Sequence, residues 1–287
     1  MLKGRIVKNI SNSYTVLCQS QNYICSPRGV LRHDKVTPLV GDICKIDEEH
    51  NLILEILPRK NELTRPHVAN VDYALIITSM VQPDFSSMLL DKELASIILA
   101  NVKPIICFTK LDLLKSKKEY EKLKEYYESI NIPCFDNEHI LSILEFLKGS
   151  LVVLTGQTGA GKSSLLNRVN PKLALATSEI SKSLNRGVHT TRHSQIYFES
   201  GVHFLDTPGF SSLDIHLKEK KDLARAFQEF ANYSCKFKDC LHIKEKDCAV
   251  KRAVEEGQIL ESRYANYLKI MEEINSENSR FISKKQG

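Results

Sequence analysis

Residues 151–169 read LVVLTGQTGAGKSSLLNRV, and this stretch decides the fold. The pattern predicts an apolar β-strand, a glycine-rich turn and then an amphipathic helix. The turn fits G-x-x-x-x-G-K-[ST], which in a strand–turn–helix context is typical of a phosphate-binding loop. Its glycines let successive backbone N–H groups converge on an anion at the helix N-terminus. The stretch therefore predicts an α/β core that binds a nucleoside triphosphate.

Each position of this loop has an expected role in such a site. Lys162 would reach the β- and γ-phosphates, and the Ser163 hydroxyl would ligate Mg²⁺. The alternative is a glycine-rich turn that merely precedes a helix, and the full set of required residues argues against it. The predicted nucleotide contacts in this stretch are Gly156, Gln157, Thr158, Gly159, Ala160, Gly161, Lys162, Ser163 and Ser164.

Length and composition bound the class of protein. The chain has 287 residues, which predicts two or three domains, and its net charge of +5 permits an anionic partner without requiring one. The N-terminus lacks the apolar region of a signal peptide, and no apolar run is long enough to cross a membrane. The eight cysteines do not form a disulfide framework, and five of them stand singly. We expect a cytoplasmic protein.

The first 62 residues contain five short β-rich segments separated by turn signals. This pattern predicts a small Greek-key barrel of the oligonucleotide-binding type, or OB-fold. Nine basic residues stand against seven acidic ones in this region, so the sequence leaves both an RNA-binding barrel and a purely structural one open. The polar segment 58–66 is predicted to be a linker. The five predicted strands are 4–7, 14–18, 23–25, 42–46 and 52–57.

From residue 71 the pattern alternates between strands and helices, which is typical of a mostly parallel α/β sheet. The predicted strands are 73–79, 104–108, 132–135, 151–155, 195–199 and 202–205, and the predicted helices are 89–101 and 115–130. Beyond residue 212 only helices are predicted, over 220–232 and 249–276. The polar tail, 278–287, is expected to be disordered.

The base specificity of the nucleotide site is predicted by Thr109-Lys110-Leu111-Asp112, at the end of the strand 104–108. GTPases carry N/T-K-x-D at such a strand end. The Asp112 carboxylate would accept from guanine N1–H and the exocyclic amine, and the Lys110 stem would lie over the base. Adenine offers no matching pair of donors, so the motif favours guanine. Thr109 stands where asparagine is commoner, which would weaken its bracing of the phosphate loop slightly.

Two further segments follow the phosphate loop. Asp206-Thr207-Pro208-Gly209 ends the strand 202–205, so that Asp206 would hold Mg²⁺ through water and the Gly209 N–H would meet the γ-phosphate. Between the phosphate loop and this DTPG motif lies a switch-like segment, in which Thr190 or Thr191 would complete the Mg²⁺ shell. We assign Thr191 to this role, while the sequence leaves Thr190 open.

The order of these motifs is unusual. GTPases ordinarily run phosphate loop, switch threonine, DxxG and then N/TKxD, whereas here TKLD (109–112) precedes the phosphate loop. A sheet tolerates this order if its original termini are joined and the chain is opened after the DxxG strand. The core is therefore predicted to be circularly permuted, and the chain leaving Gly209 would carry movement of that switch into the C-terminal region.

A cluster of cysteines follows in the C-terminal region. Cys235, Cys240, His242 and Cys248 place three thiolates and one imidazole within fourteen residues of a lysine-rich segment. Zn²⁺ favours tetrahedral Cys₃His sets, and a set of four protein ligands is typical of a structural site. Six basic residues stand against three acidic ones over 232–252, which suits either phosphate contacts or a solvated surface.

These motifs together resemble the ribosome small subunit-dependent GTPase A family. The resemblance covers the whole chain, including the barrel, the permuted core, the segments GVHTTRH (187–193) and DTPGFS (206–211), and the Cys/His cluster. It implies GTP hydrolysis stimulated by the small (30S) ribosomal subunit, contacts to 16S ribosomal RNA and a role in late subunit maturation. Two departures stand out: no guanine-bracing Ser-Ala segment is recognisable in 134–139, and Gly159 replaces the asparagine of many potassium-activated GTPases.

The catalytic group is predicted to be His189. Ras-type enzymes orient the attacking water with a glutamine after the DxxG glycine, and this chain has Phe210 there. Unaided turnover should therefore be slow, about 10⁻⁴–10⁻² s⁻¹. His189, in the first switch, is the candidate for the missing role, and the resemblance supports it; a surface-loop histidine is the alternative.

The sequence thus predicts three domains: an OB-fold-like barrel (1–62), a circularly permuted GTPase core (63–214) and a helical zinc-binding domain (215–287). The expected cofactors are GTP or GDP, Mg²⁺ and one Zn²⁺. We expect a monomer that binds the small subunit and its 16S RNA, with neither DNA nor a membrane as partner, and that leaves the subunit after hydrolysis. The rival hypothesis is an RNA-binding assembly or placeholder factor whose nucleotide is structural and turns over negligibly.

Overall fold

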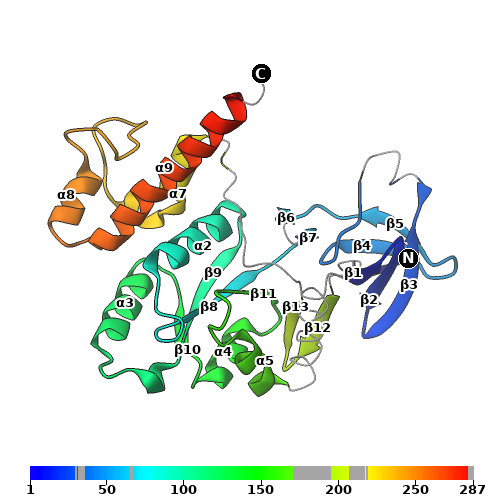
Figure 1. Ribbon diagram of the computed structural model, residues 1–287. Helices are drawn as coiled ribbons and strands as arrows, with labels where there is room; N and C mark the ends of the chain where they lie inside the picture. The colour runs from blue at the N-terminus through cyan, green and yellow to red at the C-terminus, as the bar shows by residue number, and fades with distance from the viewer. Residues whose placement is uncertain are drawn as a thin grey trace.

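The computed structural model describes residues 1–29, 31, 36–64, 67–170, 195–206, 217 and 219–283. The side chains at 64, 206 and 277–283 lie outside this description. Figure 1 shows three parts along the chain: a barrel, a central sheet flanked by helices, and a C-terminal group of helices that lies against α2. No helix of the described residues is both long enough and apolar enough to cross a membrane.

The first five strands close into the predicted barrel. Hydrogen bonding links them in the order β1-β2-β3-β5-β4, and β1 pairs with β4 to close the ring. Gly4 in β1 lies close against β2, since a Cβ there would be 2.4 Å from Cys18 Sγ and 2.6 Å from the Leu17 carbonyl oxygen. The strands are β1 (Leu2–Ile10), β2 (Ser13–Cys18), β3 (Gln21–Pro27), β4 (Ile43–Asp47) and β5 (Leu52–Ile56). The five-stranded barrel is therefore confirmed.

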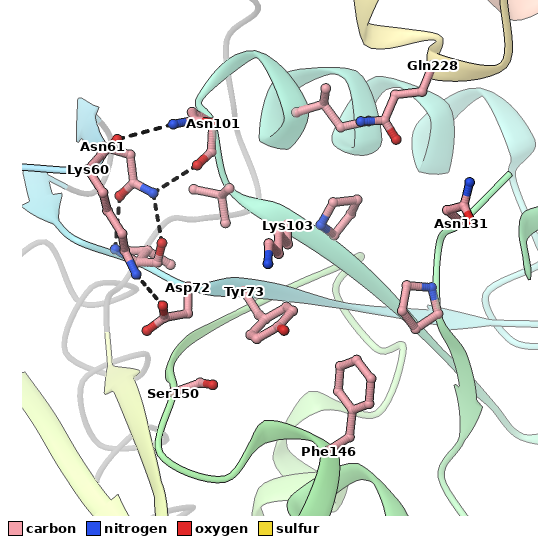
Figure 2. A pocket seen from close by; sticks show the side chains of 15 residues that line it. Lys60, Asn61, Asp72, Tyr73, Asn101, Lys103, Asn131, Phe146, Ser150 and Gln228 are labelled. Carbon is pink, nitrogen blue, oxygen red and sulfur yellow. Dashed lines mark hydrogen bonds and ion pairs between the residues drawn. The ribbon is translucent and has the colours of Figure 1, made fainter. Parts of the chain in front are cut away.

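The predicted linker is structured where it is described. It contains the strand β6 (Glu62–Thr64), which pairs with β7 (His67–Ala69) in a small antiparallel sheet. The buried Asn61 amide accepts from the Val71 N–H and donates to the carbonyls of Val71 and Asn101, at 2.7–2.9 Å (Figure 2). The segment predicted to be a linker is thus fixed by buried hydrogen bonds to Val71 and Asn101.

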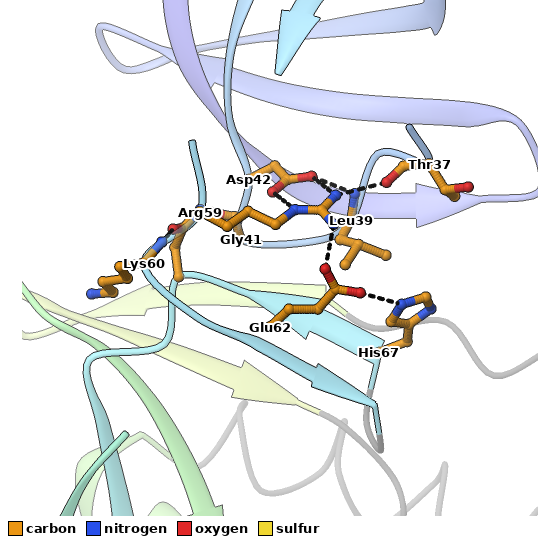
Figure 3. Close-up of polar contacts among 9 residues, drawn as sticks. Thr37, Leu39, Gly41, Asp42, Arg59, Lys60, Glu62 and His67 are labelled. Atoms are coloured by element: carbon orange, nitrogen blue, oxygen red, sulfur yellow. Dashed lines mark hydrogen bonds and ion pairs between the residues drawn. The ribbon is translucent and has the colours of Figure 1, made fainter. Parts of the chain in front are cut away.

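Arg59 ties this linker to the barrel. Its guanidinium donates two parallel hydrogen bonds, both 2.7 Å, to the fully buried Asp42 carboxylate, and a third to the Thr37 carbonyl (Figure 3). The remaining nitrogen pairs with Glu62 at 2.6 Å, and Glu62 also contacts His67. The hydrogen bonds to Asp42 raise the pKa of Arg59. A bidentate pair with a buried carboxylate fixes orientation as well as distance, so it holds the small sheet of β6 and β7 against the barrel.

The central sheet is parallel except at one edge. Its strands lie in the order β10-β9-β8-β11-β13-β12, with β12 antiparallel to β13. At that edge β12 pairs with β1 of the barrel through Lys8 and Gln195, which joins both sheets into one of eleven strands. The strands are β8 (Tyr73–Ser79), β9 (Lys103–Thr109), β10 (Cys134–Asp136), β11 (Leu151–Thr155), β12 (Gln195–Glu199) and β13 (Val202–Asp206).

Both faces of this sheet are covered by helices, which explains its nearly continuous apolar strands. In β8, Ala74 and Ile76 pack with side chains of α2 and α3, whereas Leu75 and Ile77 pack with those of α4 and α5. The sequence predicted three of these helices but not α4. The bounds are α2 (Ser87–Leu99), α3 (Lys118–Ser129), α4 (Ile140–Leu147) and α5 (Lys162–Val169), with a 3₁₀ turn, η1, at Leu111–Leu113.

The C-terminal helices differ from prediction at three points. The predicted helix 220–232 ends at Ala226, and a separate 3₁₀ helix covers 228–232 after Phe227, whose ψ of 77° is not helical. The predicted helical stretch 249–276 is broken around Gly257, which has a φ of +73°. The last helix then continues through Ser283, so residues 278–283 are helical rather than disordered. The α9 face packs against α2 and α7, and Ile274 is the last described side chain of α9 in this core. The elements are α7 (Lys220–Ala226), η2 (Gln228–Asn232), α8 (Ala249–Glu255) and α9 (Glu261–Ser283).

A buried ion cluster joins α9 to α2, one of the helices that cover the central sheet. Arg263, 1% exposed, pairs with Asp91 of α2 at 2.6 Å and with Glu229 of η2 at 2.7 Å. Its guanidinium lies 4.4 Å from the ring centroid of Phe227. Asp91 also accepts from Tyr127 of α3 and Asn266 of α9, so the cluster ties α2, α3, η2 and α9 together.

Candidate functional site

The phosphate loop begins where β11 reaches the carboxyl edge of the sheet. Gly156 there has a φ of +125°, and a Cβ on it would lie 2.0 Å from the Ile77 carbonyl oxygen, so this position requires glycine. Gly161, also at positive φ, precedes the first residue of α5. Lys162 donates to the carbonyls of Gly156 and Gln157, and burial lowers its pKa. The lysine ammonium is therefore held over the loop, at the N-terminus of a helix.

The TKLD motif lies against this loop, although it precedes it by about fifty residues. The buried Thr109 hydroxyl donates to the Ala160 carbonyl at 2.6 Å, and Lys110 Nζ donates to the Gly159 carbonyl at 2.9 Å. Lys110 adopts a left-handed φ of +60° and also contacts the Gln82 carbonyl, while Asp112 remains exposed. Because β9 and β11 run parallel in one sheet, their carboxyl ends share an edge, and the two motifs meet.

The DxxG strand occupies the expected place beside β11. Val153 pairs in parallel with Leu205, so Asp206 ends β13 at the same edge as the phosphate loop. The Asp206 side chain lies outside the described residues. So do His189, Thr190, Thr191 and Gly209, and their predicted roles stay predictions.

The segment 134–139, where no guanine-bracing motif was recognised, also reaches this edge. The Asn137 N–H donates to the Phe108 carbonyl at 3.0 Å. Arg168 of α5 donates to the carbonyls of Asn137 and Glu138. A single arginine in the helix after the phosphate loop matches no sequence motif that would predict this contact. The contact depends on the packing of α5 beside β10.

Glu93 of α2 is a buried acidic residue that sequence analysis missed. It is 6% exposed, and the Thr155 hydroxyl, one residue before the phosphate loop, donates to its carboxylate at 3.4 Å. Burial raises the Glu93 pKa to about 7, against the opposing effects of Lys162 and of the Thr155 hydrogen bond. A helical pattern places Glu93 near the core side of α2, but only tertiary packing puts it behind the loop lysine.

We expect Glu93→Gln to remove a pH dependence of stability. Between the unfolded pKa near 4.5 and the folded value near 7, the folded protein binds one proton more at this site, so stability falls as the pH rises through this window. The total loss is about 3 kcal/mol, which the amide would abolish. Urea unfolding of both proteins at pH 5 and pH 8 measures it. Glu121→Gln, an exposed carboxyl on α3, is the control, and an unchanged pH dependence in Glu93→Gln would contradict the assignment.

The Cys/His cluster comes together as the sequence predicted. The ligand atoms of Cys235, Cys240, His242 and Cys248 all lie within 4.8 Å of one another. His242 Nδ1 lies 3.3–3.5 Å from the three sulfurs, and the sulfurs of Cys235 and Cys248 are 3.8 Å apart. Zn–S and Zn–N bonds of about 2.3 and 2.0–2.1 Å give tetrahedral edges of about 3.8 Å (S–S) and 3.6 Å (S–N). The donor set therefore fits a zinc ion in chemistry and in geometry.

Hydrogen bonds hold the backbone of this cluster in place. The Glu245 carboxylate accepts from the backbone N–H groups of Leu241, Ile243 and Lys244 at 2.8–3.0 Å. From α9, the Tyr264 and Tyr267 hydroxyls donate to the carbonyls of His242 and Leu241. These contacts orient the residues beside the ligands, as outer partners of metal sites do.

Comparison with known proteins gives a consistent result. The family model described as "RsgA GTPase" matches residues 56–216, and "RsgA N-terminal domain" matches residues 3–52. The chain is 44% identical to the small ribosomal subunit biogenesis GTPase RsgA of Enterococcus faecalis, over 100% of this chain and 99% of that protein. It is 40% identical to the Bacillus subtilis protein of the same name, over 98% and 100% of the two chains.

Two solved structures share the whole fold. The crystal structure of YjeQ from Thermotoga maritima superposes with a TM-score of 0.82 and 34% identity, covering 95% of this chain and 98% of that one. The structure of YloQ, described as a circularly permuted GTPase, gives a TM-score of 0.80 and 36% identity, covering 96% of each chain. The barrel and the permuted core are thus those of known relatives, and this chain belongs to the RsgA GTPase family.

Proposed function

We propose that this protein binds GTP, hydrolyses it on the small ribosomal subunit to assist late maturation, and leaves the subunit after hydrolysis. The observation that carries the proposal is the contact of Thr109 and Lys110 with the Gly156–Ser163 loop, which supports a guanine-reading role for TKLD next to a triphosphate-binding role for the loop. The relatives are named for biogenesis of the small ribosomal subunit, which supports the choice of partner.

The proposed nucleotide contacts follow from the loop and its neighbours. Lys162 would release the loop carbonyls and pair with the β- and γ-phosphates, while backbone N–H groups of 156–161 cradle them. Asp112 would read guanine. Ser163, with Thr191 or Thr190 and Asp206, would hold Mg²⁺, which neutralises charge on the phosphates when bound. The Asp112 carboxylate is exposed, so a nucleotide could reach it.

The remaining predictions complete the proposal. His189 would orient the attacking water, because Phe210 cannot. The basic residues around the zinc cluster and the barrel would contact 16S ribosomal RNA. Three units, 1–62, 63–214 and 215–287, would divide the chain, which we propose acts as a monomer. The chain leaves β13 directly for the C-terminal helices, so movement in 207–214 would reach them covalently.

GTP turnover alone and with isolated small or large subunits tests the proposal. We expect slow turnover by the protein alone, stimulation by the small subunit only, and loss of that stimulation with retained GTP binding in His189→Ala. A placeholder factor, the rival function, would show turnover that neither subunit changes and RNA binding that ignores the nucleotide. Normal stimulated turnover in His189→Ala would overturn the role of the histidine alone.

We expect Asp112→Asn to change the preferred base from guanine to xanthine. The Asn oxygen can still accept from N1–H, but its NH₂ donates where the second carboxylate oxygen accepted, so it loses the guanine exocyclic amine and matches the additional carbonyl of xanthine. Loss of one charged hydrogen bond of about 1.5–3 kcal/mol predicts at least tenfold weaker GTP binding. Calorimetric titration with GDP and xanthosine diphosphate measures both affinities. Unchanged GDP affinity would refute the base assignment.

A further inference from the structure

A cavity of about 680 Å³ opens at the edge of the sheet opposite the phosphate loop. Its walls come from the amino ends of parallel strands: Tyr73 begins β8, Lys103 begins β9 and Ser150 precedes β11. The linker contributes Lys60 and Asn61, and η2 contributes Gln228, so all three parts of the chain line it (Figure 2). The nucleotide motifs lie at the carboxyl ends of the same strands, so this cavity is a separate site.

One wall of the cavity is aromatic. The ring centroids of Tyr73 and Phe146 lie 5.6 Å apart in an edge-to-face arrangement, and Phe146 contacts Phe135 in the same way at 5.4 Å. Phe146 is nevertheless 44% exposed, at a position on the surface of α4 where a polar side chain would be more usual. Lys103 Nζ lies 5.7 Å from the Tyr73 ring centroid, so a cation stands beside the aromatic wall. Such a pairing is typical of sites that stack a base beside its phosphate.

The other walls are polar and pre-formed. Lys60 pairs with Asp72, whose second oxygen accepts from the Leu151 N–H at 2.8 Å. Asn101 donates to the Lys60 carbonyl, which closes the rim between the linker and α2. Asn131 and Gln228 present exposed side-chain amides, which both donate and accept and so suit the edge of a base.

The charge of the cavity limits the ligand. Of its charged residues Lys60, Asp72 and Lys103, the first two neutralise each other, and no carboxylate of the described residues pairs with Lys103. One uncompensated cation suits one phosphodiester charge. A free di- or triphosphate carries two to four charges and would require an anion nest such as that of the phosphate loop. Charge therefore favours a nucleotide within an RNA strand.

We propose that this cavity binds one unpaired nucleotide of RNA, its base stacked on Phe146 and Tyr73 and its phosphate paired with Lys103. The choice of RNA rests on the proposed function, since the small subunit would supply the strand. The site would lie in the GTPase core, on the face away from GTP. It would add one RNA contact to any RNA contacts that the barrel or the zinc cluster makes.

The chain has no tryptophan, which allows a site-specific test. Phe146→Trp keeps an aromatic face and introduces the single reporter, and Leu141→Trp on the same helix, 77% exposed and outside the cavity, is the matched control. Titration with hexauridylate RNA is expected to quench the first tryptophan saturably and leave the second unchanged. Adding Lys103→Ala to the reporter should reduce the slope of log affinity against log salt by about 0.7, as for one lost phosphate contact.

The control for the lysine is Lys148→Ala, which removes a cation paired with Glu145 outside the cavity and should leave the slope unchanged. Any one of three results would overturn an RNA site: no saturable quenching at Phe146→Trp, equal quenching at Leu141→Trp, or the same curve with free uridine monophosphate. Subunit-stimulated turnover of the reporter protein, measured in parallel, separates the two proposals: stimulation without quenching defeats only this site, and absent stimulation of the unaltered protein defeats the proposed function.

Discussion

Removal of zinc is expected to unfold the C-terminal helices while the central sheet and barrel stay folded. The core of this unit is small, formed largely by side chains of α7, η2, α8 and α9 with Ala95 of α2. The segment 233–248 contains no strand and no helix, so the Cys/His ligands and the Glu245 hydrogen bonds hold it. Structural zinc contributes about 10–16 kcal/mol of apparent binding free energy, more than a domain's typical stability.

Hydrogen exchange with and without chelator, or of Cys248→Ala, measures this effect by region. Amides of α8 and of α9 near Arg263 should lose protection, and those of β8 and β9 should keep it. Cys134→Ala is the control, because it removes a buried thiol outside the cluster. Full retention of protection in α9 after zinc is shown to be lost would contradict a structural role for the metal.

Arg263→Met is expected to lower the free energy of unfolding by about 3–5 kcal/mol at pH 7. The arginine is the counter-charge for Asp91 and Glu229, which are 0% and 4% exposed, and its loss leaves two buried carboxylates without a cation. Burial already raises the pKa of Asp91 against the effect of Arg263. Without Arg263 the Asp91 carboxyl would bind a proton more readily, so the loss should shrink as the pH falls.

Urea unfolding at pH 7 and pH 5 measures this loss. Arg225→Met is the matched control: its side chain is 68% exposed and pairs with Asp222 at 3.1 Å, so removal should cost about 0.5 kcal/mol or less. Equal costs for the two substitutions would show that the buried cluster contributes no more than a surface pair.

The helix α2 connects the C-terminal helices and their Arg263 ion cluster to the nucleotide site. It carries Glu93 behind the phosphate loop, and two residues earlier Asp91 beside Arg263 of α9. Ala95, one turn on, packs in the core of the C-terminal helices. The same helix thus contacts the loop that would hold GTP and the unit that would hold zinc, which complements the covalent route from β13.

Local patterns were enough to predict much of this protein. The strand β11, its glycine turn and α5 follow from adjacent residues, because backbone conformation and period depend on near neighbours. Strands such as β8 and β9 read as apolar runs because both of their faces are covered. The Cys₃His set was recognisable because all four ligands lie in fourteen residues, so a short loop is sufficient to bring them together.

Tertiary structure decided what depends on distant residues. Three features join residues far apart in the chain: Arg59 with Asp42 (17 residues apart), Glu93 with Lys162 (69) and Phe146 with Tyr73 (73). None has a local signal, because an arginine, a glutamate or a phenylalanine has the same backbone preferences whether exposed or buried. The free energy of a buried charge or ring depends on which groups the fold packs around it, and that is determined only once the sheet has assembled.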